Sequence, residues 1–304
     1  MSDSVAVIPP SRLSEAIDLL VTPLTGDTRA GQTASIRRAL AADPAQVAGF
    51  LGSFRGAALT AVCWLQTQPG RTAMLWLPVG MDRVDSNVAA ALVARSLDVA
   101  RALDIRVVQS LPLTDAGDDA QTLREAGFVH IADLLYLVSL SAQFPTSRPA
   151  SELEFIPQAE NSLGDISHLV ERTYHDTRDC PALNGVRAID EVITGYRSIG
   201  RFRPDLWLIA RTADGDAGCV ILADHAPLGV WEIVYLGVLL ESRGRGLGLD
   251  ITRYAQWLAA RENVERLVLA VDASNDPALA MYAAAGFVSW DRRSVFVRIM
   301  EPMT

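Results

Sequence analysis

A glycine-rich loop, Arg243-Gly-Arg-Gly-Leu-Gly248, has the residue types that a diphosphate-binding site needs. It follows a strand-like apolar run over 231–238 and begins a helix-like segment over 249–262. Glycines let backbone N–H groups approach phosphate oxygens with no Cβ in the way, and a helix N-terminus presents unpaired donors and a favourable dipole. The two arginines could add charge-assisted contacts. The loop therefore predicts a site for a phosphate-bearing cofactor.

Two common phosphate-binding motifs do not fit this loop. A dinucleotide-binding loop follows the first strand of a βαβ unit, whereas this loop follows a late strand. A P-loop ends in Gly-Lys-Ser or Gly-Lys-Thr, but here Gly248 is followed by Leu249 and Asp250. A plain glycine turn that ends a strand stays open as an alternative, because glycine clusters also occur at ordinary turns.

A second motif lies downstream of the loop. An apolar run over 267–271 precedes the pattern Asn-x-x-Ala-x-x-x-Tyr at 275–282 and Gly-Phe at 286–287. Together with Arg-x-x-Gly-x-Gly at 243–248, this pattern resembles the acetyl-CoA signature of the GNAT N-acetyltransferases. The resemblance implies acetyl-CoA as acyl donor and direct transfer of its acetyl group to an amine.

The resemblance also places the cofactor on the strand before the loop. In this family that strand bulges away from its neighbour, and its exposed N–H groups bind the pantetheine arm and the thioester oxygen. Tyr235 to Val238 is the expected element, because Gly237 can adopt bulge dihedrals; a plain central strand is the alternative. The residues expected to bind acetyl-CoA are Leu236, Val238, Arg243, Gly244, Arg245, Gly246, Leu247, Gly248 and Asn275.

Two residues are candidates for proton transfer, since acetyl transfer needs a base for the attacking ammonium and an acid for the leaving thiolate. Glu232 interrupts an apolar run where several GNAT enzymes place a base; a glutamate that faces solvent is the alternative. Tyr282 lies on the helix that faces the cofactor's sulfur in the family, so its phenol is the expected acid. Core packing is the alternative for Tyr282. Asn275 is expected to cap this helix.

A polar segment, Tyr174 to Pro181, lies where the family's acceptor-binding segment falls. Its titratable side chains suit recognition of an amine. We prefer a solvated loop to a metal site, because no recognised ligand spacing relates His168, His175, Asp179 and Cys180. No metal ligand is therefore predicted, and Cys180 is not expected to accept the acyl group. The tryptophans of this half are expected in the core: Trp207, Trp231, Trp257 and Trp290.

The alternation of helices and short strands predicts an α/β fold with a mixed sheet and helices on its faces. The second half is expected to contain strands over 153–156, 206–212, 217–223, 231–239 and 267–271, helices over 163–173, 188–199 and 249–262, a short helix, and a final strand pair over 287–300. The first half repeats this order. It is expected to contain strands over 5–8, 47–54, 59–66, 73–79, 105–109 and 131–140, helices over 13–20, 35–41 and 87–103, and a short helix before 126. The segment 143–151, which contains two prolines, is the expected linker.

The two halves can be aligned, because Ala-Gly-Phe-Val at 126–129 recurs 159 residues later. The same offset places Val84 to Ala89 opposite the glycine loop, Ala73 opposite Glu232 and Leu123 opposite Tyr282. Side chains occupy positions where glycine is needed, and Asp85 would repel a phosphate. We therefore expect two tandem GNAT-like domains, a degenerate one over 1–145 and an active one over 152–304 that alone binds cofactor.

Composition excludes several classes of protein. A net charge of −9 and a pI near 5 argue against nucleic acid as a partner, since phosphate-backbone binding needs a basic surface. The apolar runs are far shorter than the roughly 20 residues that span a bilayer, and the N-terminus does not resemble a secretory signal. Three cysteines without Cys-x-x-Cys spacing indicate no disulfide framework. A cytoplasmic protein is expected.

These features together predict an N-acetyltransferase that moves an acetyl group from acetyl-CoA to the primary amine of a small molecule. The first domain either shapes the acceptor site or serves as a packing scaffold. The alternative function is a non-catalytic acyl-CoA-binding protein, in which the loop senses the cofactor and the two domains bind a partner.

Overall fold

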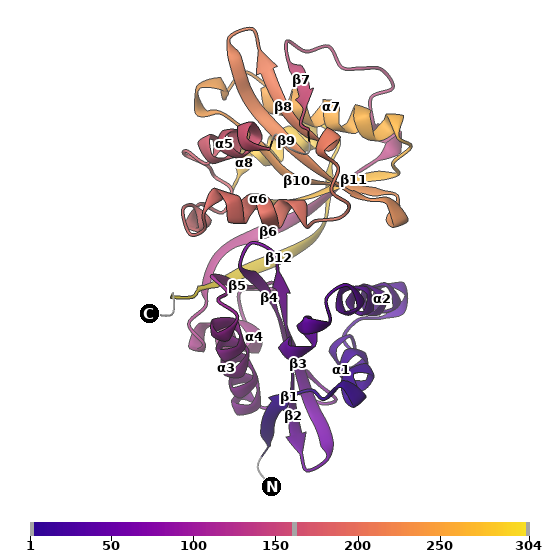
Figure 1. The fold of residues 1–304 in the computed structure, drawn as a ribbon. Helices are drawn as coiled ribbons and strands as arrows, with labels where there is room; N and C mark the ends of the chain where they lie inside the picture. The colour runs from indigo at the N-terminus through magenta and orange to yellow at the C-terminus, as the bar shows by residue number, and fades with distance from the viewer. Residues whose placement is uncertain (1–2, 160–162, 302–304) are drawn as a thin grey trace. The chain divides into compact units, whose positions relative to one another are not determined.

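The computed structural model describes residues 3–159 and 163–301, and the chain divides into two compact units (Figure 1). Unit 1 comprises Met1–Ile131 and Ser294–Thr304, and unit 2 comprises Ala132–Arg293. This division differs from the predicted boundaries of 1–145 and 152–304, because the end of each half, from Ala132 in the first and from Ser294 in the second, belongs to the other unit. The predicted boundaries remain our proposal for the two sequence repeats.

Unit 1 contains a mixed sheet in the order β1-β2-β3-β4-β5-β12, with helices on both faces. Trp64 packs beneath α1 and α2, and the next residue, Leu65, packs beneath α3 and α4, as the alternation of a strand requires. The elements are β1 (Ser4–Val7), α1 (Leu13–Leu20), α2 (Gly26–Ala42), β2 (Phe50–Arg55), β3 (Ala58–Gln68), β4 (Thr72–Gly80), α3 (Ser86–Ala102), β5 (Val107–Ser110), α4 (Asp118–Glu125) and β12 (Val288–Ile299).

Unit 2 has the corresponding sheet, in the order β6-β11-β10-β9-β8-β7. Trp207 faces the layer of α5 and α6, and Leu208 faces the layer of α7 and α8. Strands β10 and β11 run parallel, and the neighbouring pairs are antiparallel. The elements are β6 (Val129–Leu140), β7 (Glu154–Pro157), α5 (Gly164–Thr173), α6 (Ile189–Arg197), β8 (Trp207–Thr212), β9 (Gly215–His225), β10 (Val230–Val238), α7 (Leu247–Arg261), β11 (Arg266–Asp272) and α8 (Asp276–Ala284).

Each half of the sequence gives its last strand to the other unit. In unit 2, β6 pairs with β11 from Arg266↔Leu140 to Asp272↔Leu134. In unit 1, β12 pairs with β5 from Phe296↔Ser110 to Ile299↔Val107. The two strands begin and end 159 residues apart, so they are equivalent strands of the two repeats.

The predicted final strand pair over 287–300 is wrong, since one strand, β12, covers Val288–Ile299. The segment contains no glycine, proline or asparagine, and a hairpin turn usually needs such residues. The remaining predicted elements lie at the expected places, although α2 begins at Gly26 and not near Ser35. Among the described residues, no helix has the length and apolar character needed to cross a membrane.

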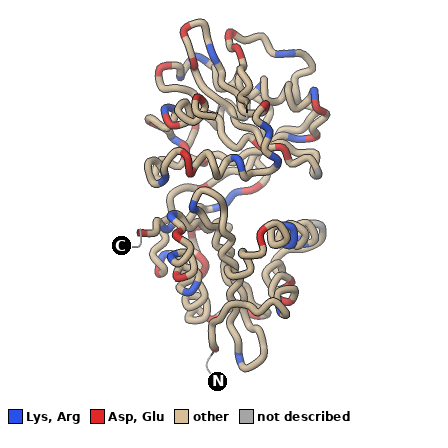
Figure 2. The backbone as a smooth tube through the Cα atoms, in the orientation of Figure 1, with Lys and Arg blue, Asp and Glu red and all other residues tan. Residues whose placement is uncertain are grey.

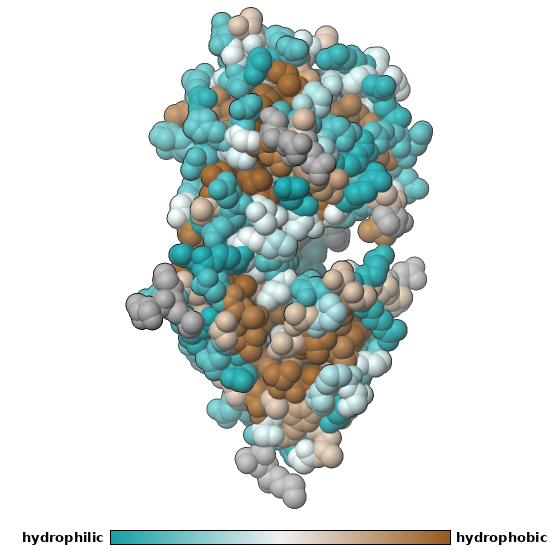
Figure 3. All heavy atoms as spheres, in the orientation of Figure 1, coloured by the Kyte–Doolittle hydropathy of each residue, from teal (hydrophilic) through white to brown (hydrophobic). Residues whose placement is uncertain are grey.

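Charged residues of both signs are interspersed along both units (Figure 2). In the view of Figure 3, hydrophilic residues cover most of unit 2, and hydrophobic residues are visible over the strands of unit 1.

Candidate functional site

Strands β10 and β11 pair at one end and then separate. Their register covers only Val230↔Arg266, Trp231↔Leu267 and Glu232↔Val268, although β10 continues to Val238 and β11 to Asp272. Beyond Glu232, the edge of β10 that faces β11 has no strand partner in the described chain. This edge offers backbone N–H and C=O groups to an extended ligand in the manner of an added strand.

The bulge in β10 lies at Val234, where the register with β9 shifts between Ile233 and Tyr235. The sequence placed it at Tyr235 to Val238 and attributed it to Gly237, and that placement is wrong. A Cβ on Gly237 would lie 2.6 Å from Thr173 Oγ1 and 2.8 Å from the Tyr235 hydroxyl. Gly237 therefore allows α5 to pack closely against β10. The bulge turns both Val234 and Tyr235 toward the layer of α5 and α6.

The glycine loop has the geometry of a phosphate cradle. Gly244 and Gly246 have φ values of 78° and 81°, in the left-handed region that favours glycine. A Cβ on either residue would meet no atom within 4 Å, so the loop faces open space. Gly246 is the N-cap of α7, and no side chain caps this helix. Leu249 N donates to the Gly246 carbonyl oxygen at 3.0 Å, which leaves the N–H groups of Leu247 and Gly248 in the first turn to face a phosphate. The site fits the diphosphate of acetyl-CoA.

Three other residues that were predicted to bind the cofactor make contacts within the protein. A Cβ on Gly248 would lie 2.7 Å from Met281 Sδ, so Gly248 allows α7 to approach α8. The Leu247 side chain is buried in the core beneath α7. Arg245 forms an exposed ion pair with Glu152 at 2.8 Å. For these residues, a contact with cofactor through backbone N–H groups remains a proposal.

Leu236 and Val238 lie on β10 beyond the point where it leaves β11, opposite Val220 and Gly218 of β9. Asn275 is the N-cap of α8, as predicted, and its side chain accepts a hydrogen bond from Ala278 N at 3.3 Å. All three therefore remain candidates for pantetheine contacts.

Arg243 is placed differently from the sequence expectation of a phosphate contact. Its guanidinium donates hydrogen bonds to four backbone carbonyl oxygens, at distances of 2.9–3.1 Å: those of Val238, Thr173, His175 and Asp176. A guanidinium has five N–H donors, so little donor capacity remains for an anion.

Glu232 lies at the point where β10 and β11 separate. Because its neighbours Trp231 and Ile233 face α7, its side chain faces the layer of α5 and α6. His225 Nε2 lies 2.9 Å from Glu232 Oε2, and both side chains are partly exposed. This hydrogen bond raises the pKa of His225 above its ordinary value. The sequence analysis missed His225, which ends the strand next to β10.

The pKa of His225 should fall toward about 6.5 in Glu232→Gln, because the amide removes the charge that stabilises the imidazolium. A raised pKa means that the pair's contribution to stability is complete below pH of about 6.5 and is lost as the pH rises through the folded-state pKa. An NMR titration of the histidine ring protons measures this shift, with the other histidines as internal controls. An unchanged His225 titration would contradict the pairing.

Tyr282 is buried, with 6% of its surface exposed, and its ring packs edge-on against Phe287. Burial, with a smaller contribution from Asp179, raises its pKa. The described chain provides no hydrogen-bond partner for its hydroxyl group. Core packing of the ring is thus present, and the phenol stays protonated at neutral pH. Proton donation to a thiolate remains a prediction for this residue.

The segment Tyr174 to Pro181, hereafter the acceptor loop, is attached to the end of β11. Asp179 Oδ1 accepts a hydrogen bond from Asp272 N at 3.0 Å, and Asp272 Oδ2 accepts one from Cys180 N at 3.2 Å. Burial, together with Asp179 and Asp272, raises the pKa of Cys180 to about 12. The thiol is therefore protonated at neutral pH, which makes it a poor nucleophile.

A tyrosine cluster that the sequence analysis missed lies beside the acceptor loop. The hydroxyl groups of Tyr174 and Tyr196 are 3.0 Å apart, and the Tyr235 hydroxyl is 2.6 Å from Thr173 Oγ1. The ring of Tyr235 packs against both other tyrosine rings. Tyr235 lies directly after the bulge. Its hydroxyl group is an unusual polar group within the apolar run over 231–238, and this is the sequence signal that could have identified it.

The predicted burial of the tryptophans is only partly correct. Trp207 and Trp231 are buried, and Trp257 is partly exposed. Trp290 is 62% exposed and packs against Tyr136 on β6, so its predicted core position is wrong. The error arose because an isolated aromatic residue in a strand gives no indication of which face is covered.

Unit 1 has diverging strands like those of unit 2, but the N-terminus of the following helix differs. Strands β4 and β5 pair only from Thr72↔Val107 to Met74↔Gln109, although β4 continues to Gly80. At the start of α3, however, the Asp85 side chain accepts a hydrogen bond from Asn87 N at 2.9 Å. A carboxylate thus occupies the helix N-terminus to which a phosphate would bind.

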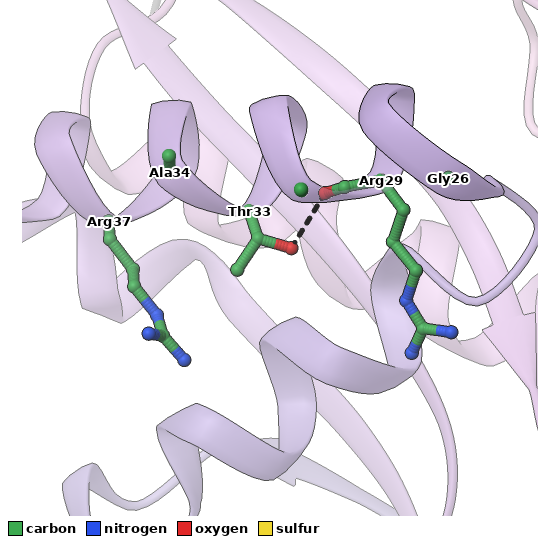
Figure 4. A pocket seen from close by; sticks show the side chains of 6 residues that line it. Gly26, Arg29, Thr33, Ala34 and Arg37 are labelled. Carbon is green, nitrogen blue, oxygen red and sulfur yellow. Dashed lines mark hydrogen bonds between the residues drawn. The ribbon is translucent and has the colours of Figure 1, made fainter.

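A groove along α2 of unit 1, of about 490 Å³, is a weaker candidate (Figure 4). Arg29 and Arg37 extend from the helix on either side of Thr33, whose hydroxyl donates to the Arg29 carbonyl at 2.9 Å. The groove contains no carboxylate, imidazole or phenol among its lining residues. It therefore lacks a base or an acid for acyl transfer.

Comparison with known protein families finds a model that matches part of unit 2. Residues 168–287 match the model of the Acetyltransferase (GNAT) family. A curated relative from Renibacterium salmoninarum, Mycothiol acetyltransferase, is 26% identical over 141 residues, which are 46% of this chain and 35% of the relative. The match thus spans little more than a third of that relative's length.

Solved structures extend the likeness over both units. A GCN5-related N-acetyltransferase from Sphaerobacter thermophilus covers 99% of this chain and 97% of its own, with a TM-score of 0.69 at 15% identity. The tandem GNAT protein from the clavulanic acid biosynthesis pathway covers 100% of both chains, with a TM-score of 0.58 at 14% identity. At these identities the likeness establishes the fold alone. It confirms the predicted fold of two tandem GNAT-like units.

Proposed function

Since residues 168–287 are a domain of the GNAT acetyltransferase family, we propose that this chain moves an acetyl group from acetyl-CoA to a primary amine by direct attack. The observation that supports the proposal most strongly is a pair of adjacent features in unit 2. The open edge of β10 beyond Glu232 suits the pantetheine arm, and the uncapped N-terminus of α7 suits the diphosphate.

Each catalytic requirement has a candidate side chain in unit 2. When bound, acetyl-CoA supplies a thioester whose carbonyl carbon the amine attacks. Glu232, with His225 hydrogen-bonded to it, accepts a proton from the attacking ammonium directly or through water. The phenol of Tyr282 gives its proton to the sulfur as the carbon–sulfur bond breaks. The free N–H groups of β10 polarise the thioester oxygen.

We propose that one acetyl-CoA binds per chain, in unit 2. In unit 1, Asp85 caps α3 and brings a negative charge to the equivalent position, so a diphosphate would be repelled there. The matched region of the family model, 168–287, also lies within unit 2.

The proposed acceptor is a small polar amine. The curated relative is named Mycothiol acetyltransferase, so polar amines related to mycothiol belong in the first panel of acceptors. The acceptor loop and Glu232 are the groups proposed to recognise the amine, because carboxylates and tyrosine hydroxyls accept hydrogen bonds from ammonium groups.

An acceptor panel with acetyl-CoA tests the proposal, with thiol release as the measurement. At least one amine should support turnover, and Glu232→Gln should lower kcat about 10-fold at pH 7 and less at pH 9, where more of the free amine is already deprotonated. Arg253→Gln, on the exposed side of α7, is the matched control. If CoA binds but no amine supports thiol release, the result would contradict the proposed enzyme activity and favour a non-catalytic acyl-CoA-binding protein.

A further inference from the structure

The side chain of Arg243 joins three parts of unit 2. Nε donates to the carbonyl oxygen of Val238, the last residue of β10. Nη2 donates to Thr173, the last residue of α5, and both Nη atoms donate to the first residues of the acceptor loop, at His175 and Asp176. The carbonyls at a helix C-terminus lack intrahelical partners and carry partial negative charge, so a guanidinium suits them.

The other end of the acceptor loop is attached to β11. The reciprocal hydrogen bonds of Asp179 and Cys180 with Asp272 involve the last residue of that strand. The loop thus begins at the end of β10 and returns to the end of β11, the two strands that separate beyond Glu232. It lies across the open end of the gap in which the pantetheine arm is proposed to bind.

Resting on the proposed function, we propose that Arg243 is a positioning residue that couples acyl-donor binding to the order of the acceptor loop. The arginine is the first residue of the glycine loop, so its backbone is fixed when a diphosphate binds there. Its side chain transmits that restraint to the acceptor loop through the carbonyls of His175 and Asp176. The equivalent residue of unit 1 is Val84, which packs against apolar neighbours. Unit 1, in which Asp85 occupies the helix N-terminus, therefore also has no arginine at this position to bind loop carbonyls.

The variant Arg243→Lys separates this role from phosphate binding. Lysine keeps the charge but has a single side-chain nitrogen. That nitrogen cannot bind all four carbonyl oxygens that surround the planar guanidinium group of Arg243. Hydrogen–deuterium exchange of the acceptor loop should become roughly 10-fold faster or more, because each hydrogen bond to a charged group is worth about that factor. Peptides from the body of α7 should exchange at the wild-type rate.

Arg172→Lys is the matched control, because Arg172 also lies in the last turn of α5 but pairs with the exposed side chain of Glu241 at 2.9 Å. It should leave exchange of the acceptor loop unchanged. If Arg243→Lys does not fold, as judged by circular dichroism, Arg243→Gln provides the same comparison with fewer donors. Wild-type exchange of the loop in a folded Arg243 variant would overturn the proposal.

The coupling itself is measured with CoA. Saturating CoA should slow exchange of the acceptor loop in the wild type and have no such effect in Arg243→Lys, while the Kd of CoA changes by less than about 3-fold. A Kd raised 10-fold or more with unchanged loop exchange would identify Arg243 as a phosphate ligand and overturn the proposal. Failure of the wild type to bind CoA would overturn the coupling.

A kinetic measurement distinguishes failure of this inference from failure of the proposed function. With an active amine, Arg243→Lys should raise KM for the amine about 5-fold or more and leave KM for acetyl-CoA within about 2-fold. Equal increases in both KM values would overturn the inference. If no amine is acetylated by the wild type, the proposed activity fails, and the exchange experiments still decide whether Arg243 holds the loop.

Discussion

Gly246→Asp should raise the Kd for CoA about 100-fold or more, because it adds a negative charge and backbone strain at the proposed phosphate cradle. Gly246 has a φ of 81° and is the N-cap of α7. A carboxylate at this position could accept the hydrogen bonds that the first turn of α7 would otherwise donate to a phosphate. Isothermal titration calorimetry with CoA measures the effect, and circular dichroism confirms that the variant is folded.

Two variants separate the causes of this loss. Gly246→Ala introduces the strain without the charge and should raise the Kd about 10-fold or less. Asn87→Asp adds the same carboxylate to the equivalent position of unit 1 and should leave the Kd within about 2-fold. Equal losses in Gly246→Asp and Asn87→Asp would mean that unit 1 also binds cofactor. A wild-type Kd for Gly246→Asp would exclude the α7 cradle.

The contrast between the two units explains why a single cofactor is expected. The structural frame is common to both, since β4 and β5 diverge as β10 and β11 do. The difference lies at the helix N-terminus, where Asp85 stands at the position of Gly244 and its carboxylate accepts a hydrogen bond from Asn87 N. Under the proposal of a single cofactor site, a few different residues in one loop are enough to separate the two units, while the sheet that positions the loop is the same in both.

The local parts of the fold followed from the sequence because their causes are local. The Asn275 cap and the boundaries of α1 and α3 depend on residues within a few positions, and the structure has them where they were predicted. The exchange of β6 and β12 did not follow, because equivalent repeat strands have the same pattern and length. Only the pairing of β6 with β11 and of β12 with β5 distinguishes the two arrangements.

The sequence predicted which residues lie at the candidate site better than it predicted what each of them contacts. Gly237 was predicted to form the bulge, but it allows a close approach to Thr173. Gly248 was predicted to contact the cofactor, and in the structure it allows a close approach to Met281. The contacts of Arg243 with loop carbonyls could not be predicted, because they join residues nearly 70 positions apart in the sequence. Spacing identifies which residues surround a site, whereas side-chain contacts decide what each one does.

Tyr282→Phe should lower kcat about 100-fold while leaving the Kd for CoA within about 2-fold, as expected for loss of a general acid. The hydroxyl group has no hydrogen-bond partner in the described chain, so its removal should change the free energy of unfolding by less than about 1 kcal/mol. The raised pKa keeps the phenol protonated through the neutral range, so the effect should persist from pH 6 to pH 9. Steady-state kinetics and thermal unfolding provide the two measurements.

Tyr254→Phe is the matched control, because Tyr254 stacks on Phe155 at 3.7 Å in the same unit, against the same core. Its removal of a hydroxyl group should leave kcat within about 2-fold. The effect of Tyr282→Phe should also shrink with an acyl donor whose thiol is more acidic, because a better leaving group needs less help from a proton donor. Wild-type turnover in Tyr282→Phe would mean that the tyrosine serves only to pack against Phe287. A loss of kcat that is the same for both acyl donors would place Tyr282 in a step other than departure of the thiolate.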